Sequence, residues 1–223
     1  FVLDTRAKRG DARLETLIIA ARDQGIAVQY SRRESLDKLA GPQNQGVVAR
    51  ARPRSAGDEH ALAAHLDGLD HPPLLLILEG VTDPHNLGAC LRSADAAGVD
   101  ALVVPRRHAA GLTPVACRSA AGAAEALAYF EVGNLARVLE MLKDRRIQVA
   151  GTALNERSQS LFDFQPDAAL AVVMGAEGEG LRRLTLERCD DLIAIPMAGD
   201  VQSLNVSVAT GVVLFHIRAR RPA

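Results

Sequence analysis

The clearest candidates for chemistry are three short polar side chains within an apolar segment. Ser203, Asn205 and Ser207 alternate with Leu and Val residues between positions 193 and 211. Hydroxyl and amide groups donate and accept hydrogen bonds, so a set of them in an apolar run can orient a polar ligand. An ordinary connection between a strand and a helix would give these three residues no obvious task. We therefore interpret the segment as part of a binding site.

Arg92 is a second candidate, because it places a permanently charged guanidinium among Leu, Cys and Ala residues. A charge in apolar surroundings needs an anionic partner. Two interpretations stay open at this stage. Arg92 binds a phosphate, or it forms a salt bridge within the chain, for example to Glu79 or Asp95.

A glycine-rich run, Gly175-Ala-Glu-Gly-Glu-Gly180, is the third candidate. Glycines let backbone amides approach a ligand closely. The run is neither a dinucleotide-binding G-x-G-x-x-G nor a phosphate loop, since no Gly-Lys-Ser/Thr follows it. Taken alone, it is also compatible with a plain tight turn.

Each of these candidates follows an apolar run in which hydrophobic and polar residues do not alternate. Such runs are typical of strands buried on both faces of a parallel sheet. We predict strands at 74–78, 101–105, 149–152, 169–174 and 192–195. We predict helices at 86–98, 113–128, 135–146, 181–189 and 206–218. Pro196 ends the last strand, and Asn86, Asn134 and Asn205 are the expected helix caps. Strands alternating with helices predict a parallel-sheet α/β domain over residues 73–223.

A small basic α/β unit precedes this domain. We predict a helix at 11–25, a strand at 27–30, a helix at 32–40 capped by Ser31, and a strand at 46–50. Residues 53–72 contain Pro, Gly, Ser and acidic residues, so we expect a linker there. The chain starts with Phe1 rather than Met, and we expect that residues preceding it are not included.

Charge is divided unevenly along the 223 residues, although the net charge is only −1. Residues 1–54 carry 11 Lys and Arg against 6 Asp and Glu, whereas residues 55–223 carry 15 against 21. This division suggests that phosphate contacts are concentrated in the first unit, although composition alone equally fits a solvated surface. The three cysteines have no metal-ligand spacing, and no long uncharged apolar run occurs. We expect a cytoplasmic protein with reduced thiols, no metal and no membrane span.

Three stretches, at 79–98, 175–180 and 195–209, closely resemble the three signature motifs of the SpoU (TrmH-type) RNA ribose 2′-O-methyltransferases, and they occur in that family's order. The resemblance is greatest to the bacterial enzymes that methylate a guanosine ribose of 23S rRNA. It implies a deep trefoil knot near the C-terminus of the parallel-sheet domain, a homodimer formed through that domain, and S-adenosyl-L-methionine as the cofactor. It also implies that residues 1–52 form a ribosomal-protein-like domain that binds the RNA substrate.

The resemblance assigns roles to individual residues of this sequence. The implied catalytic and ribose-positioning residues are Asn86, Arg92, Glu177, Ser203 and Asn205. The implied cofactor contacts are Gly175, Ile195, Met197, Gly199 and Leu204. The candidate RNA contacts in the first domain are Arg6, Arg9, Arg32, Arg33 and Arg50.

Transfer of a methyl group to a ribose hydroxyl requires alignment of the two groups and removal of one proton. The family favours Arg92 as proton acceptor, yet a guanidinium is a poor base, so we prefer a phosphate clamp, with Glu177 as support or alternative base. His216 stands where close relatives usually have glutamate, which affects a dimer contact rather than activity. The partners expected are 23S rRNA or ribosome-assembly intermediates. The alternative function is a non-catalytic RNA-binding or ribosome-assembly factor with the same fold.

Overall fold

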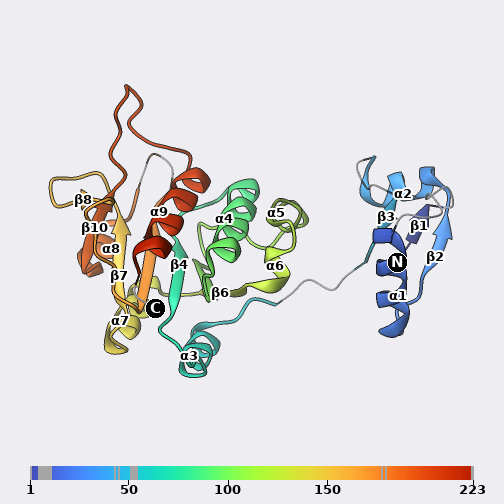
Figure 1. The fold of residues 1–223 in the computed structure, drawn as a ribbon, viewed down its shortest axis with the longest axis horizontal. Coiled ribbons are helices and arrows are strands. Elements are labelled where there is room, and N and C mark those ends of the chain that lie inside the picture. The colour runs from blue at the N-terminus through green and yellow to red at the C-terminus, as the bar shows by residue number, and fades with distance from the viewer. Residues whose placement is uncertain are drawn as a thin grey trace. The chain divides into compact units, whose positions relative to one another are not determined.

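The computed structural model describes residues 2–4, 12–42, 44, 46–50, 55–176, 178 and 180–221, with only the backbone of 2–4 (Figure 1). The chain divides into two compact units, Phe1–Pro53 and Arg54–Ala223. Each unit has its own sheet, of three strands in the first and seven in the second. In the described part of the chain, no helix is long and apolar enough to cross a membrane.

The first unit is a small α/β layer. Strand β1 pairs in parallel with β2 and antiparallel with β3, which gives the order β2-β1-β3. Its elements are β1 (Val2–Asp4), α1 (Ala12–Asp23), β2 (Gln29–Ser31), α2 (Arg33–Ala40) and β3 (Val47–Val48). The prediction that Ser31 caps the second helix is wrong, because Ser31 ends β2 and Arg32 precedes the helix without a capping side-chain bond.

The second unit is built on a parallel sheet in the order β6-β5-β4-β9-β7-β10-β8. The strands are β4 (Leu74–Leu78), β5 (Ala101–Pro105), β6 (Ala128–Val132), β7 (Gln148–Thr152), β8 (Gln159–Ser160), β9 (Leu170–Met174) and β10 (Asp191–Ala194). All five predicted strands are present, within one or two residues at their ends. The parallel-sheet α/β prediction is confirmed.

Helices cover both faces of this sheet (Figure 1). They are α3 (Glu59–Asp67), α4 (Pro84–Ala97), α5 (Pro114–Ala120), α6 (Ala123–Ala126), α7 (Leu135–Asp144), α8 (Arg183–Arg188) and α9 (Val206–Arg220). Successive side chains of a strand point to opposite faces. Accordingly, Leu74, Leu76 and Leu78 of β4 belong to the core beneath α4 and α9, whereas Leu75 and Ile77 belong to the core beneath α3 and α7. The unbroken apolar run is thus explained by burial on both sides.

Two helix predictions require correction. Helix α4 begins at Pro84, and the Asp83 side chain accepts the backbone N–H of His85, so Asn86 lies inside the first turn rather than at the cap. The long helix expected at 113–128 is interrupted at Ala121 and Gly122, which both have positive φ. Two short helices result, and the chain continues into the unpredicted strand β6.

Part of the segment expected to be a linker is folded. Helix α3 is capped by Asp58, whose carboxylate accepts the backbone N–H of Ala61. Leu62 and Leu66 of this helix are buried in the core that also contains α7. Residues 59–67 therefore belong to the second unit.

Helix α4 lies between α5 and α9, and its contact with α5 depends on Gly88. A Cβ added at Gly88 would lie 2.4 Å from the carbonyl oxygen of Ala116 and from Cβ of Ser119. A Cβ at Gly211 of α9 would have its nearest neighbour, Ser93 Oγ, at 3.7 Å. The close approach of two helix backbones thus requires glycine at position 88 but not at position 211.

We expect Gly88→Ala to lower the free energy of unfolding by about 1–3 kcal/mol, because the added methyl group overpacks the interface between α4 and α5. Gly211→Ala is the matched control. It should leave stability unchanged or raise it by up to about 1 kcal/mol, since alanine favours a helix interior. Urea denaturation of both variants checks this, and equal effects would contradict the packing argument.

Candidate active site

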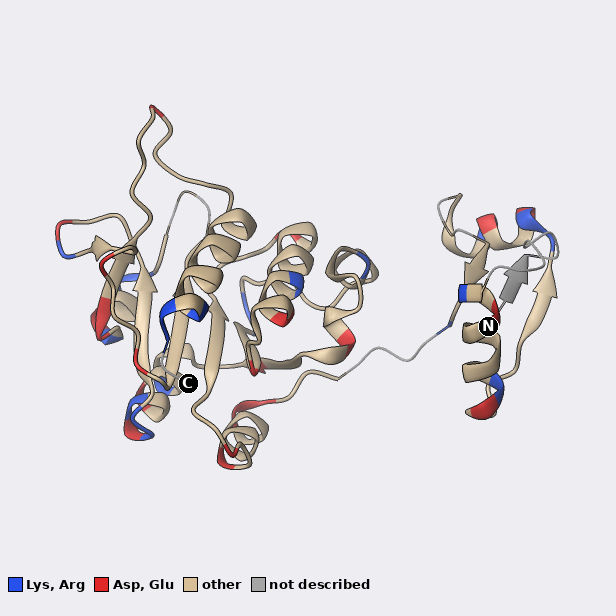
Figure 2. Ribbon diagram, in the orientation of Figure 1, with Lys and Arg blue, Asp and Glu red and all other residues tan. Residues whose placement is uncertain are grey.

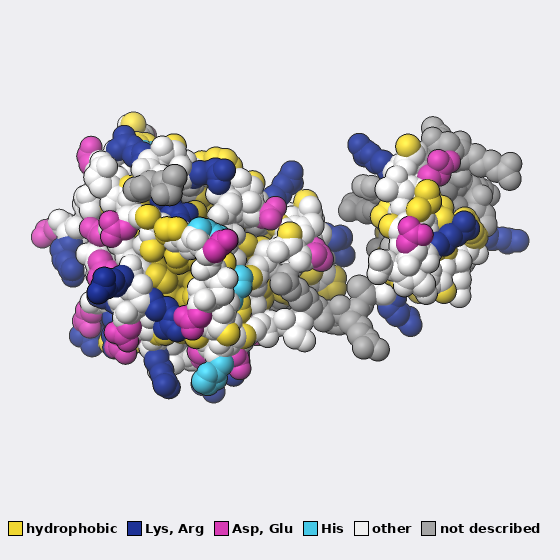
Figure 3. Space-filling model, turned by 60° about the horizontal axis from the view of Figure 1, so that its bottom comes forward, with side chains coloured by type: hydrophobic (Ala, Val, Ile, Leu, Met, Phe, Trp, Pro, Cys, Tyr) yellow, Lys and Arg dark blue, Asp and Glu magenta, His cyan; other side chains and the backbone are white. Residues whose placement is uncertain are grey.

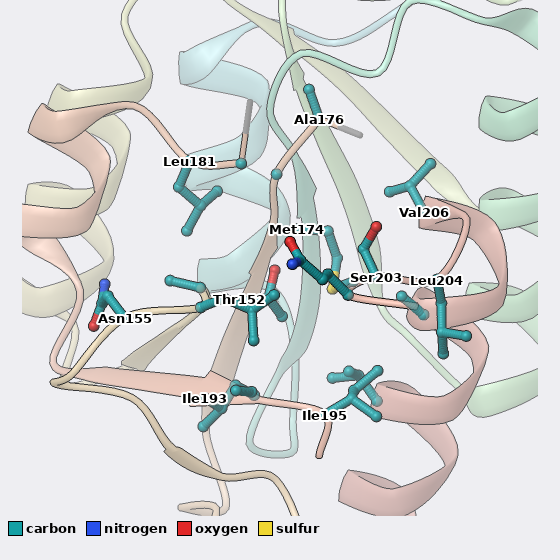
Figure 4. Close-up of a pocket in the computed structure, with 18 of the residues that line it drawn as sticks. Thr152, Asn155, Met174, Ala176, Leu181, Ile193, Ile195, Ser203, Leu204 and Val206 are labelled. Atoms are coloured by element: carbon teal, nitrogen blue, oxygen red, sulfur yellow. The ribbon is translucent and has the colours of Figure 1, made fainter. Parts of the chain in front are cut away.

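A cavity of about 550 Å³ lies at the carboxyl ends of β7, β9 and β10. Parallel α/β sheets commonly bind ligands at this edge, and the volume is in the range of small-molecule sites. In Figure 4, Asn155 and Leu181 stand on one side of the cavity and Leu204 and Val206 on the other. The lining is mostly apolar with a few polar groups, as suits a ligand that combines an apolar body with polar ends.

The glycine-rich loop after β9 forms one wall. A Cβ at Gly175 would lie 2.4 Å from the backbone carbon of Gly180, so only glycine lets the loop close on itself. Gly180 donates its N–H to the carbonyl oxygen of Ala176 at 3.0 Å and has a φ of +67°. Gly178 also has a positive φ, of +82°. Backbone groups rather than side chains therefore shape this wall.

The segment between β10 and α9 forms the facing wall. Asn205 caps α9, because its Oδ1 accepts the backbone N–H of Ser207 at 2.9 Å, as the sequence predicts. Of the residues proposed to contact a cofactor, four line the cavity: Gly175, Ile195, Met197 and Leu204. The fifth, Gly199, lines an adjoining hollow, which also includes Met197. The structure thus brings this predicted group together.

Three of the five predicted catalytic residues, Ser203, Asn205 and Asn86, lie at or next to the same wall. Ser203 lines the cavity (Figure 4). Asn205 donates from Nδ2 to Oδ1 of Asn86 at 3.1 Å, which joins the start of α9 to the first turn of α4. The hydroxyl of Ser207 donates to Oδ1 of Asn205 at 2.6 Å and holds that amide in place. Glu177, the one carboxylate among the five predicted catalytic residues, lies outside the described residues.

Arg92 is exposed on α4, and the proposed salt bridge to Glu79 is not formed. Glu79 is buried and accepts the backbone N–H of Arg182 and the hydroxyl of Thr185, each at 2.9 Å. Among the described residues, Arg92 makes no ion pair with Asp95 or any other carboxylate. Because Arg92 is exposed, solvent can stabilise its charge, and the phosphate-binding role stays a prediction.

The arginines proposed to contact RNA differ in their exposure and in the partners that they have within the first unit. Arg32 and Arg50 are exposed. Arg33 forms an ion pair with Asp37 at 3.1 Å and donates to the carbonyl oxygen of Pro42, so part of its charge is already used within the unit. Arg6 and Arg9 lie outside the described residues. On the second unit, basic and acidic residues are interspersed along the chain (Figure 2).

Several cavity residues were not anticipated from the sequence, namely Thr152, Ala153, Leu154, Asn155 and Leu181. Thr152 is the last residue of β7, and the next three residues continue the chain from it. The sequence predicted an irregular segment from residue 154 onwards. The available signal was their position directly after a predicted parallel strand, because such strands end at the ligand-binding edge. Within the described residues, no group of three or more His, Cys, Asp or Glu is arranged to hold a metal ion.

Helix α9 exposes an apolar stripe beside the site. Val208, Val212 and Phe215 are 53%, 37% and 51% exposed, at the spacing of one helix face. The ring centroids of the neighbouring His216 and of Phe162 are 5.3 Å apart, and burial together with Arg220 lowers the pKa of this histidine, which favours its neutral form. On the face of the second unit shown in Figure 3, hydrophobic side chains gather between charged ones.

Each of the two units matches a known protein-family model. Residues 73–215 match the model of the SpoU rRNA Methylase family, and residues 4–56 match that of the RNA 2′-O ribose methyltransferase substrate-binding domain. The chain is 51% identical over 214 residues to the 23S rRNA (guanosine-2′-O-)-methyltransferases RlmB of Photobacterium profundum and of Escherichia coli K12. The match covers 96% of this chain and 86% and 87% of those proteins.

Solved structures agree with the sequence relatives. The SpoU methyltransferase AviRb from Streptomyces viridochromogenes superposes with a TM-score of 0.77 at 26% identity, covering 98% of this chain and 80% of AviRb. Its complex with the cofactor AdoMet superposes with a TM-score of 0.72 at 25% identity, covering 98% and 81%. The family model spans more than half of the chain, and the relatives match nearly all of it. The chain therefore belongs to the SpoU rRNA methylase family.

Proposed function

We propose that this chain transfers a methyl group from S-adenosyl-L-methionine to the ribose 2′-hydroxyl of a guanosine in 23S rRNA. The observation that carries the proposal is the hydrogen bond between Asn86 and Asn205. It links the first turn of α4, the helix that carries Arg92, to the start of α9, a helix that lines a cavity suited to a small cofactor. The link occurs in a chain that matches two RNA-methyltransferase domain models.

The cofactor, when bound, supplies a methyl group that is already activated, so the chain must mainly orient and deprotonate. We assign Gly175, Ile195, Met197 and Leu204 to binding, with Gly199 beside them. Apolar side chains and backbone groups of these residues exclude water from the reacting groups. Alignment of this kind accounts for much of the acceleration of a bimolecular transfer.

Ser203, Asn205 and Asn86 are proposed to hold the ribose, because their hydroxyl and amide groups lie together where α9 meets α4 next to the cavity. Arg92 is proposed to clamp a phosphate, for which its planar fork is suited. Glu177 supports the site or accepts the hydroxyl proton in place of Arg92. The ribose oxygen would take the methyl group as the bond between that group and the cofactor's sulfur breaks, so that S-adenosyl-L-homocysteine is released, and loss of the hydroxyl proton leaves a neutral ether on the ribose.

The first unit is proposed to bind the RNA, through exposed Arg32 and Arg50, Arg33 in part, and Arg6 and Arg9. Phosphate contacts of this type bind without reading sequence. The substrate is 23S rRNA, free or in ribosome-assembly intermediates. The three cysteines are free, which agrees with a cytoplasmic location. The trefoil knot implied by the sequence motifs stays a prediction.

A homodimer through the second unit completes the proposal. The stripe of Val208, Val212 and Phe215 on α9 is more apolar than a solvated helix face usually is, and it lies on the helix that borders the cavity. Its chemistry fits a second copy of the same stripe, as in a two-fold interface. The lowered pKa of the adjacent His216 favours the uncharged form, which such an interface would bury more easily.

Incubation of the full chain with methyl-labelled S-adenosyl-L-methionine and 23S rRNA tests the function. We expect label in one guanosine, resistant to alkaline cleavage on its 3′ side because the 2′-hydroxyl is methylated. Asn86→Ala should reduce the single-turnover rate by about 100-fold or more, as for loss of an aligning group. Binding of RNA without any methylation, on free rRNA and on assembly intermediates alike, would favour the non-catalytic assembly factor.

Arg92→Lys distinguishes a phosphate clamp from a proton acceptor. Lysine keeps the charge but loses the planar fork, so a clamp predicts residual activity, roughly tenfold weaker RNA binding and unchanged cofactor binding. Single-turnover methylation with saturating RNA is measured against pH. The clamp gives the same pH midpoint as the wild type at a lower rate, whereas a displaced midpoint would identify Arg92 as the proton acceptor.

Val212→Asp should convert the dimer to a monomer at micromolar concentration, because the dimer would bury an unpaired carboxylate at its centre. Leu184→Asp is the matched control. Leu184 is 52% exposed, compared with 37% for Val212, but it lies on α8 rather than on the proposed interface. Sedimentation velocity gives the masses. A wild-type chain that sediments as a monomer would refute the proposed dimer.

A further inference from the structure

Among the described residues, Glu79 is the only charged side chain that is buried, with 4% of its surface exposed. It stands directly after β4, four residues before the cap of α4. A buried carboxylate costs free energy unless it is hydrogen-bonded. Glu79 is not among the residues proposed to bind the cofactor or the RNA or to take part in the reaction, so its burial needs another explanation.

Both carboxylate oxygens of Glu79 are used, and both bonds go to the same distant segment. Oε2 accepts the backbone N–H of Arg182, and Oε1 accepts the hydroxyl of Thr185, which is itself buried. Arg182 precedes α8 and has no capping bond from its own side chain. Glu79 thus supplies the cap for a helix more than 100 residues further along the chain, with a negative charge at the favourable end of the helix dipole.

The segment held in this way continues directly into the cavity wall. Leu181, adjacent to Arg182, lines the cavity and packs so close to β7 that a Cβ at Gly151 would lie 2.8 Å from its Cδ1. On the other side of the glycine-rich loop, the N–H of Glu79 donates to the carbonyl oxygen of Met174 at 2.9 Å. Residue 79 therefore contacts the chain before and after the glycine-rich loop.

The next residue strengthens the same link. Gly80 has a φ of +81°, and a Cβ there would lie 2.9 Å from Cβ of Ala176, inside the glycine-rich loop. The connection from β4 to α4 is thus packed on the loop that it is bonded to. Because this connection also leads to Asn86, it joins the ribose side of the site to the cofactor side.

From these contacts we propose that Glu79 is a positioning residue for the cofactor pocket, acting through Arg182, Thr185 and Leu181 without touching the cofactor. This inference rests on the proposed cofactor site. Loss of the carboxylate would release the end of the glycine-rich loop. Cofactor binding would then have to order the loop, and the conformational entropy lost in doing so would weaken the affinity for the cofactor. The contacts of Glu79 described above are all with residues of the second unit, and RNA binding is assigned mainly to the first, so we expect RNA affinity to be unchanged.

The test is calorimetric titration of S-adenosyl-L-methionine into full-length variants without RNA. Glu79→Leu keeps similar bulk but removes both acceptors, and we expect its Kd for the cofactor to rise about tenfold, as for loss of hydrogen bonds to a charged group. Thr185→Val removes one bond and should give a smaller rise. Glu79→Asp retains the carboxylate and should recover most of the affinity. RNA affinity should stay within about twofold of wild type in all three.

Glu140→Gln is the matched control, because the Glu140 carboxylate also bonds to the α8 region, through Arg188 at 3.0 Å, but away from the cavity. Its cofactor Kd should equal that of the wild type. An unchanged cofactor Kd in Glu79→Leu, or equal losses of cofactor and RNA affinity that follow a lower Tm, would overturn the proposal. If Glu79→Leu does not fold, the same criteria apply to Thr185→Val. A wild-type chain that binds the cofactor but does not methylate rRNA would refute the proposed function and leave this test intact.

Discussion

The parallel pairing of β4 with β9 brings together the two functional segments that follow these strands. The two strands are in register over their whole length, from Leu74 opposite Leu170 to Leu78 opposite Met174. Parallel strands that start together also end together, so the connection after β4 and the glycine-rich loop after β9 emerge side by side. The buried bonds of Glu79 and the contact of Gly80 with Ala176 are consequences of that register.

Close backbone approach is the second constraint on the site. At Gly175 the glycine-rich loop returns onto its own backbone, and at Gly88 helix α4 meets the backbone of α5. A side chain at Gly175 would open the loop that lines the cavity, and one at Gly88 would push α4 away from α5. Small residues thus replace the large aromatic side chains that many cores use, in a chain with no Trp and only 3% aromatic residues. The compact packing around α4 in turn keeps Asn86 within hydrogen-bonding distance of Asn205.

Charge is arranged according to solvent exposure. The buried carboxylate, Glu79, has both oxygens hydrogen-bonded within the second unit, whereas Arg92 is exposed to solvent. Surface pairs such as Arg33 with Asp37 contribute little to stability but reduce the charge that an RNA would meet. A basic residue in the sequence is therefore a weak guide to RNA contact until its partners are known.

The sequence by itself determined the strands of the second unit, because five unbroken apolar runs are compatible with few environments other than a sheet buried on both faces. It also determined the cap at Asn205 and the motifs that carry the family resemblance, since these are local in the chain. It misplaced the start of α4 and missed β6, where Asp83 and the left-handed residues Ala121 and Gly122 outweigh helical periodicity. The partners of Glu79, the exposure of Arg92 and the position of Thr152 to Asn155 in the cavity became known only from the tertiary structure. Those contacts join segments up to about a hundred residues apart, and their geometry follows from strand order and register, which hydrophobic periodicity does not specify.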